Sequence, residues 1–108
     1  MWPSAIYSPV SGLNVEKMTY YRQELNKLNQ KIYDAIISGK SDNNIKYTDF
    51  QNLIVDLGFE FHHQDGSHRF YAHKIYPAIM NIQPDGNKAK GYQVRQLRNL
   101  IKKFNLKG

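Results

Sequence analysis

Residues 59–73 read FEFHHQDGSHRFYAH. The stretch contains two aromatic-rich segments, residues 59–64 and 68–73, which flank the dipeptide Asp65-Gly66. Aromatic residues favour strands, and Asp-Gly is typical of the tight turns that join antiparallel strands. The stretch therefore predicts a β-hairpin, and the other elements of the fold can be placed on either side of it.

A helix is predicted on each side of the hairpin, and a third strand, residues 78–83, follows the hairpin directly. The first helix can be capped by Thr48 or Asp49 and ended by Gly58, because glycine tolerates the left-handed backbone found after helices. The second helix covers roughly residues 92–104, after a loop at residues 84–87. Apolar residues at helical spacing give each helix one buried face: Phe50, Leu53, Ile54 and Leu57 in the first, and Val94, Leu97, Ile101 and Phe104 in the second.

The order helix, three antiparallel strands, helix predicts an α+β fold. Because each helix has a single apolar face, both can pack on the same side of the small sheet, which leaves the other side open. We divide the chain into residues 1–44, an arm with a helical extension, and residues 45–108, a compact domain.

Residues 1–44 divide further into an arm, a helix and a linker. Residues 1–14 contain prolines and glycine without periodicity, residues 15–37 carry a two-heptad apolar stripe, and residues 39–44 break the helical pattern. The stripe can pack against the chain's own domain, or it can contact a partner helix or a second copy, and so short a repeat does not decide between these. Its members are Met18, Tyr21, Leu25, Leu28, Ile32 and Ala35.

Charge is distributed unevenly along the chain, whose net charge is +6. Residues 66–108 contain nine Lys or Arg and one acidic residue, a balance of +8, whereas residues 1–65 contain six and eight, a balance of −2. The C-terminal part is therefore expected to bind a polyanion. A basic surface that only maintains solubility is the alternative.

Cysteine is absent from the chain, which excludes disulfides, thiolate metal sites and cysteine nucleophiles. The first residues show no basic segment followed by an apolar one, and the longest aliphatic run, residues 53–55, is far too short to cross a membrane. We therefore expect a soluble, cytoplasmic protein.

All four histidines of the chain, His62, His63, His68 and His73, lie in the predicted hairpin. A zinc site needs three or four ligands around one point, but His62 and His63 are neighbours on one strand and should face opposite sides of the sheet. His68 and His73 are an odd number of residues apart and should also face opposite sides. No metal site is therefore expected. Ser67 and His68 are a poor nucleophile pair, because side chains adjacent in sequence rarely meet.

His68 differs from the other histidines because it directly follows the turn, where its ring can reach both solvent and ligand. An imidazole can take the proton of a ribose 2′-hydroxyl, or return one to a leaving 5′-oxygen, at neutral pH. Arg69 and Lys74 follow in the sequence, and cations nearby would stabilise the extra charge on the phosphorane. An ordinary surface histidine is the alternative interpretation.

Three cations, Arg95, Arg98 and Lys102, fall at positions i, i+3 and i+7 of the last predicted helix. They should project together beside its apolar face. With Lys88 and Lys90 in the preceding loop, they could hold an RNA backbone. A solvated charged face is the alternative.

Several ordered motifs between about Lys40 and Leu106 resemble the HicA family of bacterial toxins. They are Asp65-Gly66-Ser67-His68 after Leu57-Gly58-Phe59, then Ile82-Gln83-Pro84-Asp85-Gly86, Ala89-Lys90 and Tyr92-Gln93-Val94-Arg95-Gln96. The resemblance covers about two thirds of the chain. One departure is Arg69, which stands where many relatives have a second histidine.

The resemblance implies a small endoribonuclease that cleaves messenger RNA, folds like a double-stranded-RNA-binding domain and is neutralised by a HicB antitoxin. The catalytic histidine of the family's Gly-Ser-His motif corresponds to His68, whereas the other three histidines inherit no role. No metal or cofactor would be needed. The ribose 2′-hydroxyl would be the nucleophile, which restricts the substrate to RNA. Arg69, Lys74 and Tyr71 are possible contributors to the second proton transfer, and none stands out. The residues expected to contact RNA are Ser67, Arg69, Lys74, Lys88, Lys90, Arg95, Arg98 and Lys102.

Two other classes of function stay open from the sequence. A noncatalytic RNA-binding module would share the fold and the charge but would not depend on His68. A protein-interaction domain would use the stripe in residues 15–37 and would need the basic half only for solubility.

Overall fold

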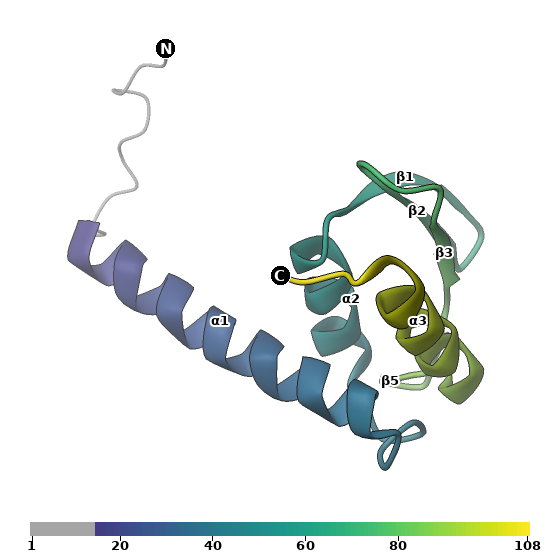
Figure 1. Cartoon of the computed structure of the whole chain (residues 1–108), viewed down its shortest axis with the longest axis horizontal. Helices are drawn as coiled ribbons and strands as arrows, with labels where there is room; N and C mark the ends of the chain where they lie inside the picture. The colour runs from purple at the N-terminus through teal and green to yellow at the C-terminus, as the bar shows by residue number, and fades with distance from the viewer. Residues whose placement is uncertain (1–14) are drawn as a thin grey trace.

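The computed structural model describes residues 15–108, which form an α+β fold with three helices and a three-stranded antiparallel sheet (Figure 1). The arm predicted at residues 1–14 lies outside the described residues. The order of helix, three strands and helix predicted for residues 45–108 is confirmed, and a short β4–β5 hairpin occupies the loop predicted at residues 84–87. The elements are α1 (Val15–Ser38), α2 (Tyr47–Asp56), β1 (Phe59–Asp65), β2 (His68–His73), β3 (Ile79–Ile82), β4 (Pro84–Asp85), β5 (Lys88–Ala89) and α3 (Gly91–Phe104).

β2 is the central strand of the sheet and pairs antiparallel with β1 and β3. The hairpin predicted here is confirmed, but its two turn residues are Gly66, at φ +61°, and Ser67, because Asp65 belongs to β1 and pairs with His68. Tyr71 of β2 pairs with Met80 of β3, and both are buried on the side of the sheet where α2 and α3 lie (Figure 1). On the other side, Ile79 is 62% exposed. The sheet therefore has one covered face and one open face, as the single apolar faces of the two helices predict.

α1 is a 24-residue helix whose two halves have different surroundings. Its C-terminal half contributes Ile32 and Ile36 to the same hydrophobic core as α2, α3 and the sheet, so this half packs against its own domain. Its N-terminal half extends away from the body of the molecule (Figure 1), and Met18, Tyr21 and Leu25 there are exposed. Within residues 15–108, no helix combines the length and the apolar composition that a membrane span requires.

α2 begins at Tyr47 without the side-chain cap predicted from Thr48 or Asp49. Its N-cap residue is Lys46, and no side chain in the described part of the chain makes a capping hydrogen bond. The backbone N–H of Tyr47 instead donates to the carbonyl of Asn87, in the β4–β5 turn, at 2.9 Å. The helix begins before Thr48 and Asp49, so these residues lie inside its first turn and are not its cap.

α3 buries three of the four residues predicted for its apolar face. Val94, Leu97 and Ile101 are buried, whereas Phe104 is only partly buried at the end of the helix. Phe104 stacks on Tyr76, with ring centroids 5.1 Å apart. Because Tyr76 is itself partly exposed, Phe104 lies at the edge of the core and not inside it.

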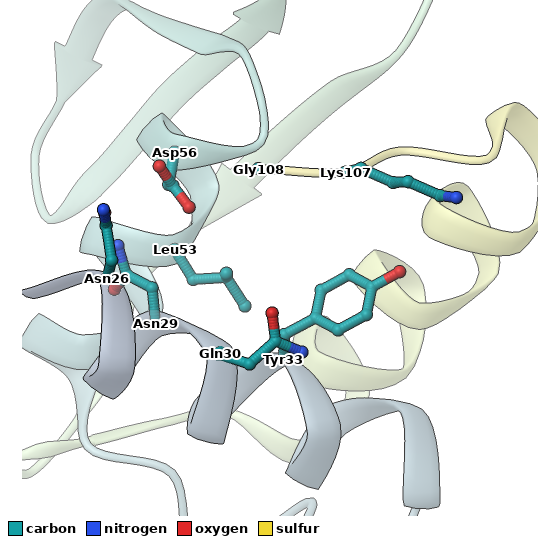
Figure 2. Close-up of a pocket in the computed structure, with 8 residues that line it drawn as sticks. All are labelled: Asn26, Asn29, Gln30, Tyr33, Leu53, Asp56, Lys107 and Gly108. Atoms are coloured by element: carbon teal, nitrogen blue, oxygen red, sulfur yellow. The ribbon is translucent and has the colours of Figure 1, made fainter. Parts of the chain in front are cut away.

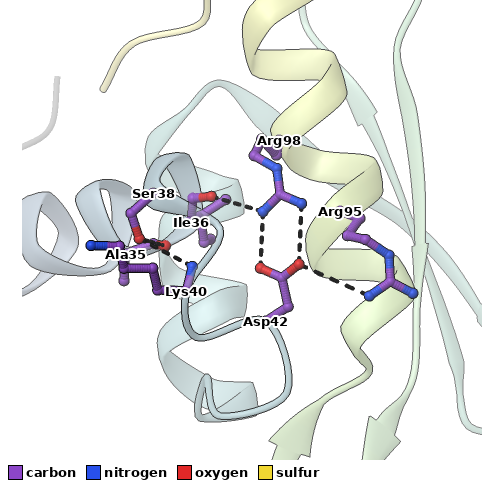
Figure 3. Close-up of polar contacts among 7 residues, drawn as sticks. All are labelled: Ala35, Ile36, Ser38, Lys40, Asp42, Arg95 and Arg98. Carbon is purple, nitrogen blue, oxygen red and sulfur yellow. Dashed lines mark hydrogen bonds and ion pairs between the residues drawn. The ribbon is translucent and has the colours of Figure 1, made fainter.

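An ion pair joins the loop after α1 to α3 (Figure 3). Arg98 donates from Nη1 and Nη2 to the two carboxylate oxygens of Asp42, at 2.9 and 3.1 Å, and its Nη1 also donates to the carbonyl of Ile36 at 3.0 Å. The side chains of Arg98 and Asp42 are only 16% and 13% exposed. A bidentate pair is specific in its geometry, so Arg98 fixes the C-terminal end of α1 against α3.

The electrostatics of this pair follow from the same contacts. The hydrogen bond from Arg98 lowers the pKa of Asp42; burial acts in the opposite direction, and the charges of Arg98 and Arg95 lower it further. The hydrogen bond to Asp42 also raises the pKa of Arg98. Both groups therefore hold their charges more firmly in the folded chain than in the unfolded chain.

We predict that Asp42→Asn lowers the free energy of unfolding by about 2 kcal/mol at neutral pH, because the partly buried guanidinium of Arg98 loses its charged partner. The pKa of Asp42 is lower in the folded than in the unfolded chain, so its stabilising effect is complete above the unfolded value and is lost as the pH falls through the folded value. Urea unfolding of wild type and variant should show the difference shrinking in strongly acidic buffer. A difference that stays constant down to that pH would contradict the assignment.

Gly58 lies directly beside the side chain of His73. Its φ is +102°, and a Cβ at this position would lie 2.7 Å from His73 Nε2. His73 is held in place, because its Nε2 donates to the carbonyl of Leu57 at 2.8 Å and its Nδ1 accepts from the backbone N–H of Ile75 at 3.1 Å. The glycine predicted to end the helix is therefore needed for two reasons, its backbone conformation and the space it leaves.

Gly58→Ala should lower the free energy of unfolding by about 3 kcal/mol, since it adds a steric conflict to a strained backbone. Gly86→Ala is the matched control, because Gly86 also has a positive φ, +65°, but no atom of residues 15–108 lies within 4 Å of the added Cβ. The control should lose only about 1 kcal/mol. Equal losses in chemical denaturation would mean that the contact with His73 carries no penalty.

Candidate active site

His68 begins β2 on the open face of the sheet. Residues two apart on a strand share a face, so His68 lies on the same side as Phe70 and opposite the buried Tyr71. Phe70 pairs with Asn81 of β3, and His68 Nδ1 lies 3.1 Å from Asn81 Oδ1. Because this oxygen can only accept a hydrogen bond, Nδ1 carries the proton. The other ring nitrogen, Nε2, makes no hydrogen bond within residues 15–108 and can receive a ligand.

His62 and His63 lie beside each other because β1 contains a β-bulge. The pairing register shifts between Phe61 and His63, so His62 is the extra residue. The two imidazole rings have centroids 4.9 Å apart, and their Nδ1 atoms are 2.7 Å apart. The prediction that these neighbours face opposite sides of the sheet is therefore wrong, since it assumed the regular alternation that a bulge interrupts.

The bulge also brings His63 onto the open face that carries His68. His63 pairs with Phe70 across the β1–β2 ladder, and the two rings stack with centroids 4.3 Å apart and an angle of 8° between their planes. The Phe70 ring centroid is in turn 6.5 Å from that of His68. We call His62, His63, His68, Phe70 and Asn81 the histidine cluster.

The fourth histidine, His73, lies away from this cluster on the covered face, as predicted. Its ring packs edge-on against Phe59, with centroids 5.0 Å apart, and both of its nitrogens bond to backbone atoms. In the part of the chain that the structure describes, no three residues of the types His, Cys, Asp and Glu are placed to hold one metal ion. The hydrogen bonds of its ring to backbone atoms give His73 a structural role.

Two cations predicted to assist His68 lie elsewhere. Arg69 is adjacent to His68 on a regular strand and faces the opposite side, where its Cζ lies 4.3 Å from the centroid of the Phe61 ring and its Nη1 donates to Gln64 at 2.7 Å. Lys74 follows the far end of β2, about 20 Å from His68 along an extended chain. Neither side chain is placed to stabilise charge that develops at His68, because strand geometry separates them from it.

A chain of hydrogen bonds connects Lys90 to the turn beside His68. Lys90 Nζ donates to Gln83 Oε1 at 2.8 Å, and Gln83 Nε2 donates to Ser67 Oγ at 2.9 Å. The buried Gln93 holds the backbone N–H of Gln83 through its Oε1 at 3.1 Å. Gln83 and Gln93 were not predicted as site residues, although both stand in the motifs that carry the HicA resemblance. Lys90 is therefore linked to the same end of the sheet as the candidate catalytic histidine.

The cations predicted along α3 do not form one projecting stripe. Arg98 is held by Asp42 and cannot project with its neighbours, which corrects the prediction for this residue. Arg95 lies 3.9 Å from the same carboxylate, yet its side chain is 53% exposed, and Lys102 and Lys88 are also exposed. Helical spacing alone cannot reveal that an acid from another segment engages one member of a stripe.

A separate cavity of about 470 Å³ lies between α1, α2 and the C-terminal residues (Figure 2). Asn29 is buried there, and its Oδ1 has no hydrogen-bond partner among the described residues. The charged residues of the lining, Asp56 and Lys107, have opposite signs, so this cavity does not suit a polyanion. It shares no residue with the histidine cluster. The lining comprises Asn26, Asn29, Gln30, Tyr33, Leu53, Asp56, Lys107 and Gly108.

Comparisons of the chain with protein-family models, with curated proteins and with solved structures find no match. The interpretation of the site therefore rests on its own residues and geometry. That geometry places imidazole nitrogens on an open sheet face, which is an arrangement suited to general acid–base chemistry on a large substrate.

Proposed function

We propose that the protein is a metal-independent endoribonuclease of the HicA type, the toxin of a type II toxin–antitoxin system, which cleaves messenger RNA and inhibits translation and growth. The observation that carries the proposal is the state of His68: Nδ1 is hydrogen-bonded to Asn81 Oδ1, and Nε2 makes no hydrogen bond within residues 15–108. The Gly-Ser-His sequence and the basic C-terminal half support it. In this proposal the domain resembles a double-stranded-RNA-binding fold and acts in the cytoplasm.

The proposed reaction needs only groups that the chain and RNA provide. His68 Nε2 takes the proton of a ribose 2′-hydroxyl, whose oxygen attacks the adjacent phosphorus. The bond from phosphorus to the 5′-oxygen breaks, and the products are a 2′,3′-cyclic phosphate and a 5′-hydroxyl end. Asn81 keeps the proton on Nδ1, so that Nε2 is the nitrogen that receives the proton from the ribose. DNA lacks the 2′-hydroxyl and is therefore not a substrate.

The RNA backbone would be held by cations near the turn and along α3. Lys90 is the best placed of these, because Gln83 connects it to Ser67, the residue before His68. Lys88, Arg95 and Lys102 are exposed and can add phosphate contacts that do not depend on sequence. Arg98 would serve this surface indirectly, by holding α3 in place.

A toxin of this kind requires a partner that keeps it inactive. A HicB-like antitoxin with an acidic surface would complement the balance of +8 in residues 66–108 and cover His68. The exposed half of α1 provides an additional surface for the helix-mediated contact through residues 15–37. Its apolar stripe, with Met18, Tyr21 and Leu25, suits an amphipathic partner.

We predict that His68→Ala lowers the rate of RNA cleavage by about 10²- to 10⁴-fold, because it removes the general base. Asn81→Ala should lower the rate less, by about 10- to 100-fold, since Nε2 remains but the ring is no longer oriented. The measurement is cleavage of a labelled transcript by purified variants whose folding is verified by circular dichroism. RNA affinity should change little in both variants.

Ile79→Ala is the matched control, because Ile79 is exposed on the same sheet face but its side chain cannot transfer a proton. It should cleave at the wild-type rate. If His68→Ala cleaves as fast as wild type, His68 does not have the proposed role. A wild-type protein that binds the transcript but never cleaves it would establish the noncatalytic RNA-binding module instead.

Phosphate contacts can be tested through the salt dependence of binding. In the His68→Ala background, Lys90→Gln and Lys102→Gln should each reduce the slope of log affinity against log salt by about 0.7, the value for one contact to single-stranded RNA. Arg98→Gln should leave that slope unchanged and lower the unfolding free energy by about 2 kcal/mol. Fluorescence anisotropy titrations at several salt concentrations distinguish these outcomes, and an unchanged slope for Lys90→Gln would remove that contact.

A further inference from the structure

The proposed reaction needs a second proton-transfer group, because the leaving 5′-oxygen must gain a proton. We infer that His63 is this general acid, an inference that rests on the proposed endoribonuclease function. His63 has no such role in the sequence pattern, and its candidacy comes from the β-bulge that places it on the same face as His68.

The positions of the two histidines suit opposite sides of one phosphodiester. His63 is directly opposite Phe70, and His68 lies two residues before Phe70 on the neighbouring strand. Diagonal neighbours of this kind have Cα atoms about 7–8 Å apart. In an in-line displacement the attacking and leaving oxygens lie on opposite sides of phosphorus. Each oxygen must form a hydrogen bond of about 2.8 Å to its own proton-transfer group. Two imidazoles at this spacing can bracket the scissile phosphate.

The contacts of His63 leave one nitrogen for the substrate. Its Nδ1 lies 2.7 Å from Nδ1 of His62, so one of these nitrogens donates a hydrogen bond to the other. When His63 is protonated on both nitrogens, Nδ1–H donates to a neutral His62, and Nε2–H is left to point elsewhere. Stacking on Phe70 limits rotation of the His63 ring. His62 therefore positions His63 in the way that Asn81 positions His68.

The proposed step moves two protons. The proton of the 2′-hydroxyl moves to Nε2 of His68 as the bond from the 2′-oxygen to phosphorus forms. As the bond from phosphorus to the 5′-oxygen breaks, that oxygen takes the proton from Nε2 of His63. His63 ends neutral and His68 ends protonated, and proton exchange with water restores both.

A substrate with sulfur in place of the bridging 5′-oxygen separates the two roles, because a thiolate is stable near neutral pH and leaves without a proton. His63→Ala should cleave ordinary RNA about 10²- to 10⁴-fold more slowly than wild type, but should cleave the 5′-thio substrate within about threefold of wild type. His68→Ala should be slow with both substrates, since the attacking hydroxyl still needs a base. Single-turnover rates on short labelled RNAs measure these effects.

His63→Phe keeps an aromatic ring against Phe70, but this ring cannot transfer a proton. The variant should therefore behave like His63→Ala. A wild-type rate for His63→Phe on ordinary RNA would mean that His63 acts only by stacking, and would overturn the inference. Ile79→Ala controls for a change on the same face. Equal losses on both substrates in the His63 variants, or thio rescue of His68→Ala, would also overturn it. Failure of the proposed function is a separate outcome, in which His68→Ala cleaves ordinary RNA at the wild-type rate.

Discussion

Burial of Tyr71 against the helices sets the direction of the other side chains on β2. Tyr71 pairs with Met80, and both lie in the core. Because alternate residues of a strand point to opposite faces, this burial directs His68 and Phe70 to the open face and Arg69 to the covered one. A shift of one residue in the pairing would place His68 beneath the helices. The pairing register that buries Tyr71 in the core therefore also places the imidazole of His68 on the open face.

Two further features connect the packing of the helices to the open face. Gln93, buried in α3, bonds to the backbone of Gln83, whose side chain holds Ser67 in the turn before His68. Arg98 binds Asp42 and so holds α3 against the end of α1. A shift of α3 would therefore move Gln83 and, through it, Ser67 in the turn before His68. These hydrogen bonds explain how polar groups at the end of a small sheet with one open face are held in position.

The basic residues of the C-terminal half divide into two groups once the structure is known. Arg69 and Arg98 make multiple contacts inside the chain, over an aromatic ring and to a carboxylate respectively. Lys88, Arg95 and Lys102 form the second group: their side chains are exposed, and in the proposed function they are the ones that can reach phosphates. Arginine suits the first group because its planar guanidinium forms bidentate and stacked contacts that lysine cannot form.

The sequence by itself determined the features that depend on neighbouring residues: the hairpin around Gly66, the helix that ends just before Gly58, the amphipathic last helix, and the position of His68 directly after a turn. Only the tertiary structure decided the bulge that turns His63 toward His68, the bond from His68 to Asn81, the capture of Arg98 by Asp42, and the backbone partner of Tyr47. These contacts join residues that are distant in sequence or depend on how one strand pairs with another. Local spacing carries no information about such partners, because they meet only when the core brings their segments together.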